Sequence, residues 1–368
     1  MRIGIDATPL LGEQTGVGTY TSRLLSQLRD GWMDDFVATA FTWRGRGSLS
    51  GVVPAGVDVT TRPAPARLLR AAWGRDLPLP VELLSGPLDV FHATNFVLPP
   101  TRRAAAVLTV HDLAYLRHPD TVSAASLAYR HLVPLGVARA DVILTPSAAV
   151  AQQLSDAYAR AGNRIIVTPL GVEPAWFDAV PADSEWLRQL GITRPYVVAV
   201  GTREPRKNLA ALVAAYRELL RQSDDVPDLV FAGGRGWGDL LITAGVPPDR
   251  LYTTGYLPLP DLRRLVAGAS LLAFPSRDEG FGLPPLEALA CGVPVVANDI
   301  PVLREVLGTE AVWCDADDPS AFAQAILETL RDPPGSAASR RAHAARFTWR
   351  RCAELTYEGY RRAVAARR

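Results

Sequence analysis

Two glutamates, Glu279 and Glu287, lie eight residues apart in the stretch SRDEGFGLPPLEALACG, which runs from Ser276 to Gly292. The residues between them include two glycines and a pair of prolines. Two carboxylates around a glycine turn are typical of acid/base hydrolysis, of a metal site, or of a pocket for a hydroxyl-rich ligand. The residues and elements around the two glutamates are needed to choose among these three kinds of site.

Local signals predict where the two carboxylates lie. The segment LLAFPSRDEGFGLPPLEALACGVPVVA is typical of a strand, a loop, a helix, a turn and a second strand. The proline pair fits the first turn of the helix, and Gly292 fits its C-terminal stop. Glu279 is therefore expected in the loop before the helix, and Glu287 in its early turns. The backbone N–H groups expected to point at a ligand are those of Phe281, Gly282 and Leu283.

A pair of cations follows another predicted strand, in the segment VAVGTREPRKNL. Arg206 and Lys207 fall where a loop meets a helix, so that the helix dipole adds to their charges, and such a place suits a diphosphate. Lys207 is the only lysine among the 39 lysine and arginine residues of the chain. The P-loop pattern G-x-x-x-x-G-K-[ST] is absent.

Further candidate residues lie in loops after other predicted strands. The stretch GEQTGVGTYTSRLL has a glycine-rich turn, with Gly16 and Gly18, that opens a helix, but its spacing disfavours a dinucleotide site. The stretch TVHDL places His111 at the carboxyl end of a strand, where its ring can donate a hydrogen bond to a ligand. The loops LVFAGGRGWGD and TTGYLPLPDL are places for a nucleobase, and the second contains Gly255, Tyr256 and Leu257.

The order of predicted elements indicates the fold. Short β-rich runs alternate with helical segments along the whole chain. The predicted strands are 2–5, 36–41, 89–92, 105–110, 141–145 and 165–168 in the first half, and 196–200, 229–232, 270–274 and 295–297 in the second. A loop-rich stretch at Pro174–Arg194 separates the two sets. We therefore expect an α/β fold with two Rossmann-like domains of parallel strands, which bind ligands at the carboxyl ends of those strands. The expected domains are 1–178 and 179–350, with a C-terminal helix at 351–368 that packs back toward the first domain.

Composition narrows the function further. A chain of 368 residues with 48% hydrophobic and 21% charged residues is expected to be globular, and its net charge of +1 argues against a nucleic-acid partner. Three distant cysteines form no zinc or redox spacing and favour a reducing compartment. The first ten residues contain no signal-peptide core. We expect a cytoplasmic protein, and a peripheral contact with the inner face of a membrane is left open.

Taken in order across both domains, these motifs resemble the retaining glycosyltransferases of family 4, which have the GT-B fold of two domains facing across a cleft. The matching stretches are TVHDL, GTREPRKNL, GYL and EGFGLPPLEALACGVPVV, the last with its E-x7-E pair of Glu279 and Glu287. Some relatives carry an arginine directly after the glycine of the GTREPRKNL strand, where this chain has Thr202. The arginine must then come from Arg203 or Arg206, and we favour Arg206.

The resemblance implies roles for these residues. Glu287 would bind the ribose hydroxyls of a nucleotide sugar, and Glu279, with the amides of Phe281–Leu283, would hold the sugar ring. Arg206 and Lys207 would neutralise the diphosphate, Gly16–Gly18 would close over it, and His111 would lie beside the donor sugar. No cofactor or metal is required. The expected partners are a nucleotide sugar, first GDP-mannose and then a UDP-sugar, and a glycan or glycolipid acceptor.

Other classes stay open from the residues alone. The two glutamates do not exclude a hydrolase, although a hydrolase does not need two cations for a diphosphate leaving group. The stretch CDADDP spells D-x-D with Asp315 and Asp317, a pattern of metal-dependent transferases, but it precedes a predicted helix where aspartate is ordinary. A nucleotide-sugar 2-epimerase and a non-catalytic sugar-binding protein are the remaining alternatives.

Overall fold

The computed structural model describes residues 1–12, 16–42, 46–60, 62, 65–223, 225–237 and 245–368. The chain divides into two compact units. Unit 1 comprises Met1–Arg117, Ala124–Gly171 and Thr348–Arg368, and unit 2 comprises His118–Ser123 and Val172–Phe347. The expected boundary after residue 178 thus falls inside unit 2. Where the chain enters and leaves that unit, the Val172 amide donates a hydrogen bond of 3.0 Å to the Phe347 carbonyl.

Unit 1 is built on a parallel sheet whose described strands have the order β3-β2-β1-β4-β5-β6-β7. The strands are β1 (Arg2–Asp6), β2 (Asp35–Thr39), β3 (Asp58–Thr60), β4 (Val90–Ala93), β5 (Ala105–Thr109), β6 (Val142–Thr145) and β7 (Ile165–Val167). The helices are α1 (Gly16–Gly31), α2 (Ala66–Gly74), α3 (Glu82–Ser85), α4 (Ala114–Arg117), α5 (Ala124–Leu127), α6 (Tyr129–Arg139), α7 (Ala148–Ala157) and α16 (Trp349–Ala366). The order reverses between β1 and β4, and such a switch point is where open parallel sheets bind ligands.

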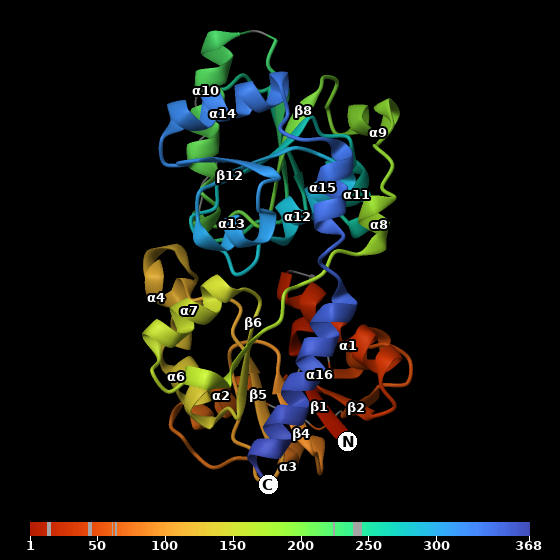
Figure 1. The fold of residues 1–368 in the computed structure, drawn as a ribbon, viewed down its shortest axis with the longest axis vertical. Helices are drawn as coiled ribbons and strands as arrows, with labels where there is room; N and C mark the ends of the chain where they lie inside the picture. Colours follow the sequence, from red (N-terminus) through yellow and green to blue (C-terminus); the bar gives the residue numbers. More distant parts are fainter. Residues whose placement is uncertain (13–15, 43–45, 61, 63–64, 224, 238–244) are drawn as a thin grey trace. The chain divides into compact units, whose positions relative to one another are not determined.

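The C-terminal helix α16 is part of unit 1. It packs against α1 and across the central strands of the sheet (Figure 1). Its buried face includes Cys352, Ala353, Tyr360 and Ala363, which recur at the spacing that an amphipathic helix needs. Tyr360 also donates or accepts a 2.8 Å hydrogen bond with Nδ1 of the buried His92 on β4, so a specific polar contact fixes the helix on the sheet.

Unit 2 contains a second parallel sheet, with the described strands in the order β10-β9-β8-β11-β12-β13. The strands are β8 (Tyr196–Val200), β9 (Asp228–Ala232), β10 (Leu251–Gly255), β11 (Leu271–Phe274), β12 (Val295–Asn298) and β13 (Ala311–Cys314). The helices are α8 (Pro174–Phe177), α9 (Ser184–Gln189), α10 (Leu209–Gln222), α11 (Leu259–Ala267), α12 (Leu283–Cys291), α13 (Pro301–Leu307), α14 (Pro319–Arg331) and α15 (Ala337–Ala344).

Helices cover both faces of this second sheet. Helices α10 and α14 pack against each other and lie on one side of β8, while α11 and α15 lie on the other (Figure 1). The core on the first side includes Leu212, Tyr216, Phe322 and Ile326. Because both faces are covered, the central strands are almost continuously apolar, as in LLAF of β11.

Two findings extend the sequence analysis. The sheets contain three strands that it did not predict, β3, β10 and β13, and each of the three lies at an edge of its sheet. In addition, no helix among the described residues is long and apolar enough to span a bilayer.

Candidate active site

Three predicted residues come together at the carboxyl edge of the unit 2 sheet. The Lys207 ammonium donates a hydrogen bond of 2.6 Å to Glu279 Oε1, and Arg206 Nη1 lies 3.6 Å from Glu279 Oε2. The cations follow β8 and the carboxylate follows β11, which are neighbouring strands. Only 13% of the Lys207 side chain and 9% of the Glu279 side chain are exposed. The arrangement is a largely buried carboxylate held by two cations.

The cations decide the protonation state of Glu279. Burial alone would raise the pKa of this carboxyl, but Lys207 and Arg206 outweigh it and lower the pKa below its ordinary value. The ammonium also lies 5.1 Å from the centre of the Phe274 ring, which favours a cation at this place. Glu279 is therefore a carboxylate at neutral pH.

Glu204 belongs to the same cluster, although the sequence analysis did not single it out. Its Oε2 lies 3.3 Å from Arg206 Nη2, and the Arg206 Nη1 group donates a 3.0 Å hydrogen bond to the Asp278 carbonyl. The guanidinium is thus oriented from both sides. Of the two candidate arginines, Arg206 is the one whose contact with Glu279 is described, and its role in binding a diphosphate stays a prediction. The only sequence signal for Glu204 was its place two residues before Arg206, in GTREPRKNL.

Helix α12 begins beside this cluster, as predicted from the proline pair. Gly282 is its N-cap residue, with a φ of 90° that an L side chain rarely adopts, and a Cβ there would lie 2.5 Å from Leu303 Cδ2. As a glycine, this N-cap residue has no side chain that could cap the helix. The proline pair occupies the second and third helical positions and has no N–H groups, so the amides that this N-terminus offers to a ligand lie at and just before the first helical residue, at the positive end of the helix dipole. The residues concerned are Phe281, Gly282 and Leu283.

Glu287 lies one turn into α12, and its environment differs from that of Glu279. Burial raises the pKa of Glu287 to about 8, Glu173 adds to the rise, and Arg263 opposes it. The two glutamates of the pair therefore differ in protonation because of their surroundings. Glu279 is held ionised by cations, whereas Glu287 is mostly protonated at neutral pH and can ionise when a ligand compensates its charge.

The raised pKa of Glu287 gives a prediction for stability. A folded-state pKa above the unfolded value stabilises the fold at low pH, and this contribution is lost as pH rises toward about 8. Glu287→Gln removes the titration. We expect the variant to gain stability relative to wild type between pH 6 and pH 8, by up to about 1.4 kcal/mol for each pH unit. Urea unfolding of both proteins at several pH values measures this, and a difference that does not change with pH would contradict it.

The aspartates of the D-x-D stretch form hydrogen bonds within the protein, and one of these reaches the residue that follows Lys207. Asp317 Oδ1 accepts 2.9 Å and 3.0 Å hydrogen bonds from Arg277 Nε and Asn208 Nδ2. Asn208 directly follows Lys207 and has a left-handed φ of 53°. Asp315 accepts the amide of Asp317, and Asp318 caps α14. Within the described residues, no group of three or more His, Cys, Asp or Glu side chains could hold a metal ion.

These contacts predict that turnover does not depend on a divalent metal. The negative charge of a leaving group can be met by Arg206, Lys207 and the N-terminus of α12. Activity should then be the same in excess EDTA as in magnesium or manganese. Loss of turnover in EDTA that either metal restores would instead assign Asp315 and Asp317 to a metal site. Asp318→Asn, which changes only a helix cap of the same loop, is the matched control for an Asp317→Asn variant.

In unit 1, His111 follows β5 in a buried aromatic setting. Its Nε2 lies 2.8 Å from the Thr94 carbonyl, and its ring contacts Tyr20 and Phe96 edge-on. Burial lowers its pKa, so the ring is neutral at pH 7. A carbonyl only accepts, so Nε2 carries the proton and Nδ1 is a hydrogen-bond acceptor. From its place in the sequence, His111 was predicted to be able to donate a hydrogen bond to a ligand. With Nε2–H bonded to Thr94, its ring can do so through Nδ1 only when it is protonated.

The remaining predicted residues lie in turns. Gly16 is the first residue of α1 and Gly18 is buried in its first turn, while residues 13–15 of the same stretch lie outside the described residues. Gly255 ends β10 with a φ of 70°, and Tyr256 is 47% exposed. Leu257 is half-buried. Of the stretch LVFAGGRGWGD, the last two residues also lie outside the described part of the chain.

Two family matches together cover most of the chain. Residues 183–347 match the family described as glycosyl transferases group 1, and residues 15–171 match the glycosyl transferase 4-like domain. These ranges correspond closely to unit 2 and to the larger part of unit 1.

Individual proteins and structures agree with this. The chain is 32% identical over 282 residues to an O-antigen chain mannosyltransferase of Escherichia coli, with 74% of each protein covered. Its fold is similar to that of a sucrose-phosphate synthase from Thermosynechococcus elongatus (TM-score 0.74, 18% identity, 99% of each chain covered). It is also similar to Anabaena HepE in complex with UDP and glucose (TM-score 0.70, 20% identity, 97% and 98% covered). With its two parallel sheets and both family matches, the chain belongs to the family 4, group 1 glycosyltransferases of the GT-B fold.

Proposed function

We propose that this glycosyltransferase moves a mannosyl residue from GDP-mannose to a glycan or lipid-linked acceptor, with retention of the anomeric configuration. Unit 2 would bind the nucleotide sugar, and unit 1 would bind the acceptor. The observation that carries the proposal is the buried cluster of Glu279, Lys207 and Arg206 beside the N-terminus of α12, whose N-cap residue is a glycine. Such a cluster suits a bound group that has both a diphosphate and a ring of hydroxyls.

The cluster meets the charge changes of glycosyl transfer. When the bond between the anomeric carbon and the phosphate oxygen breaks, its electron pair passes to the diphosphate, and the sugar gains positive character. Lys207, Arg206 and the α12 amides would stabilise the first charge, and the ionised Glu279 would stabilise the second. These groups are already oriented by their mutual contacts, so little reorganisation is needed during the reaction.

Glu287 and His111 would make further contacts with the nucleotide sugar. An ionised Glu287 accepts hydrogen bonds from two ribose hydroxyls, and its raised pKa means that nucleotide binding would release a proton below about pH 8. His111 presents an acceptor nitrogen next to the β5 edge. It would accept a hydrogen bond from a hydroxyl of the donor sugar. Gly16, Gly18 and the Gly255–Leu257 turn would complete the nucleotide contacts.

The sugar donor is the finer part of the proposal. The Escherichia coli relative is a mannosyltransferase, which favours GDP-mannose. Anabaena HepE was crystallised with UDP and glucose, so a UDP-sugar is the second candidate. An epimerase is not favoured, because the family matches and the relative are transferases.

A panel of nucleotide sugars tests the donor. We expect GDP-mannose to raise the melting temperature more than GDP-fucose, UDP-glucose, UDP-galactose or UDP-N-acetylglucosamine, because binding to the folded state stabilises it. With a mannosylated acceptor, NMR of the product should show an α-linkage. A larger shift with a UDP-sugar would transfer the proposal to that donor, a β-linkage would exclude retention, and formation of an epimer from donor alone would indicate an isomerase.

A further inference from the structure

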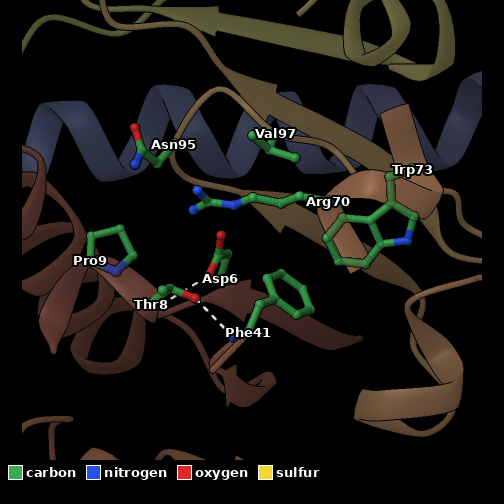
Figure 2. A pocket seen from close by; sticks show the side chains of 8 residues that line it. All are labelled: Asp6, Thr8, Pro9, Phe41, Arg70, Trp73, Asn95 and Val97. Atoms are coloured by element: carbon green, nitrogen blue, oxygen red, sulfur yellow. Dashed lines mark hydrogen bonds between the residues drawn. The ribbon is translucent and has the colours of Figure 1, made fainter. Parts of the chain in front are cut away.

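A small cavity opens at the carboxyl edge of the unit 1 sheet, and it is lined by buried polar groups that the packing of the fold does not require. Figure 2 shows the side chains around it, which come from the ends of β1, β2 and β4 and from α2. The three strands are neighbours in the order β2-β1-β4, so the cavity lies at the switch point of the sheet. The lining includes Asp6, Phe41, Arg70, Trp73 and Asn95.

Asp6 is the most unusual of these residues, because it is a carboxylate that is only 5% exposed. Within the described residues, the Asp6 side chain is hydrogen-bonded to Thr8, whose amide donates a hydrogen bond of 2.9 Å to Asp6 Oδ1. Burial raises its pKa, and Arg70 opposes the rise. A buried carboxylate with so few partners is costly for the fold and is typical of a binding site.

Asn95 gives a second, independent observation. Its Oδ1 is buried and has no hydrogen-bond partner in the described chain. The next residue, Phe96, has a positive φ of 59°, which is strained for a residue with a side chain. Strained backbone next to an unsatisfied polar atom is characteristic of functional sites.

The chemistry of the cavity selects among ligands. Asp6, Arg70 and Asn95 present a carboxylate, a guanidinium and an amide, which together accept and donate several hydrogen bonds. When Asp6 is ionised, its charge balances that of Arg70, and the cavity does not favour an anion. Phe41 and Trp73 add apolar ring surface, in edge-to-face contact with centroids 5.1 Å apart. The volume of about 80 Å³ is several times the roughly 10–15 Å³ that one water needs, and suits one edge of a sugar ring.

The cavity is also linked to His111 through a single residue. The Thr94 hydroxyl donates a hydrogen bond of 2.6 Å to the backbone carbonyl of Asp6. The backbone carbonyl of Thr94 accepts a hydrogen bond from Nε2–H of His111. The backbone of Asp6, whose side chain lines the cavity, is therefore joined through Thr94 to the residue proposed to contact the donor sugar.

We propose that this cavity binds the terminal neutral sugar of the acceptor, with Asp6, Arg70 and Asn95 contacting its hydroxyls and Trp73 and Phe41 contacting its ring. The inference rests on the proposed function and adds to it the class of acceptor, a neutral glycan end and not a phosphate. Asp6 and Arg70 are thereby acceptor-specificity residues.

Ligand-observed NMR with methyl glycosides of mannose, glucose, galactose, N-acetylglucosamine and rhamnose tests the binding directly. We expect at least one of these to bind the wild-type chain. Asp6→Asn and Arg70→Ala should each weaken this binding about tenfold or more, because each removes a charge-assisted hydrogen bond. Arg70 is exposed, so its variant is expected to fold even if Asp6→Asn does not. Arg67→Ala, an exposed change one turn earlier on α2, is the matched control and should bind like wild type.

The outcomes separate this inference from the proposed function. Calorimetry with GDP and UDP should give the same affinity in all four proteins, and absence of nucleotide binding in wild type would count against the proposed function alone. Sugar binding that is unchanged in both Asp6→Asn and Arg70→Ala would overturn the cavity assignment. So would a wild-type chain that binds none of the glycosides, or one that binds inorganic phosphate at a site lost in Arg70→Ala.

Discussion

Glu279→Gln is expected to lower kcat about 10²-fold or more and to leave the affinity for the bare nucleoside diphosphate unchanged or tighter. The carboxylate is proposed to stabilise positive character that the sugar acquires only in the transition state, and preorganised charges of this kind contribute about 10²–10³ to kcat. A bare diphosphate has no sugar to contact Glu279. It would contact Lys207 and Arg206, which lose their carboxylate partner in the variant.

Glu287→Gln should show the opposite pattern. Contacts with the ribose exist in both the ground state and the transition state, so their loss raises KM more than it lowers kcat. Because wild-type Glu287 has a pKa of about 8, its advantage over glutamine in nucleotide affinity should increase from pH 6 to pH 8.

Isothermal titration of GDP and UDP into both variants, together with steady-state kinetics, measures the two patterns. The pair is its own control, since both substitutions replace a glutamate by the same amide in one segment. If both variants lose the diphosphate equally, or both bind it like wild type, the division of roles between the glutamates is wrong.

Lys207→Met should have a comparably large effect, on both activity and stability. Removing a charge-assisted contact to the diphosphate costs about 1.5–3 kcal/mol, so kcat/KM should fall about 10- to 150-fold. The fold also loses the ammonium that lies 2.6 Å from the buried Glu279 carboxylate. Breaking a buried pair leaves an uncompensated charge and costs on the order of 3 kcal/mol, less here because Arg206 is still 3.6 Å away.

A double-mutant cycle separates the two effects. Because the pKa of Glu279 is lower in the folded state than in the unfolded state, this group stabilises the wild-type fold at pH values above the unfolded-state pKa. The contribution is lost as pH falls below that value. In Lys207→Met the folded-state pKa of Glu279 should rise toward or above its unfolded value, so less stability should be lost as pH falls through the acid range. Lys207→Met/Glu279→Gln should recover most of the stability, measured by urea unfolding, and none of the activity. Stability losses that simply add would show that the two side chains are not coupled.

Lys207→Arg tests whether the lysine itself matters, because all other residues among the 39 lysines and arginines of the chain are arginine. The variant keeps the charge but replaces a compact ammonium packed near Phe274 by a larger planar group. We expect reduced activity. Full activity would mean that the single lysine has no chemical significance.

The sequence predicted the central parts of both sheets well, and the edges poorly. Buried parallel strands such as Leu271–Phe274 are continuous apolar runs bounded by loops, so local pattern identifies them. The missed strands β3, β10 and β13 pair with a neighbour on one side only and tolerate polar residues such as the threonines of Leu251–Gly255. Their signal comes from tertiary pairing, which a single sequence does not contain.

The same distinction applies to the site. The start and end of α12 depend on prolines and glycines nearby in sequence, and these were predicted. The contact between Lys207 and Glu279 joins loops that are 72 residues apart. Glu204 and the hydrogen bond that fixes the His111 tautomer depend on atoms supplied by the fold. Residue types therefore indicated the chemistry, while the protonation states required the structure.

Unit 1 is completed by Thr348–Arg368, which is separated from the rest of that unit by all of Val172–Phe347. During synthesis the ribosome delivers the seven strands of its sheet long before it delivers α16, whose buried face covers β4, β5, β6 and β7. Unit 2 is almost continuous and can fold while the first sheet still has an uncovered apolar face. The nascent chain therefore passes through a stage that is prone to aggregation and open to chaperones, and removal of the last helix would make that stage permanent.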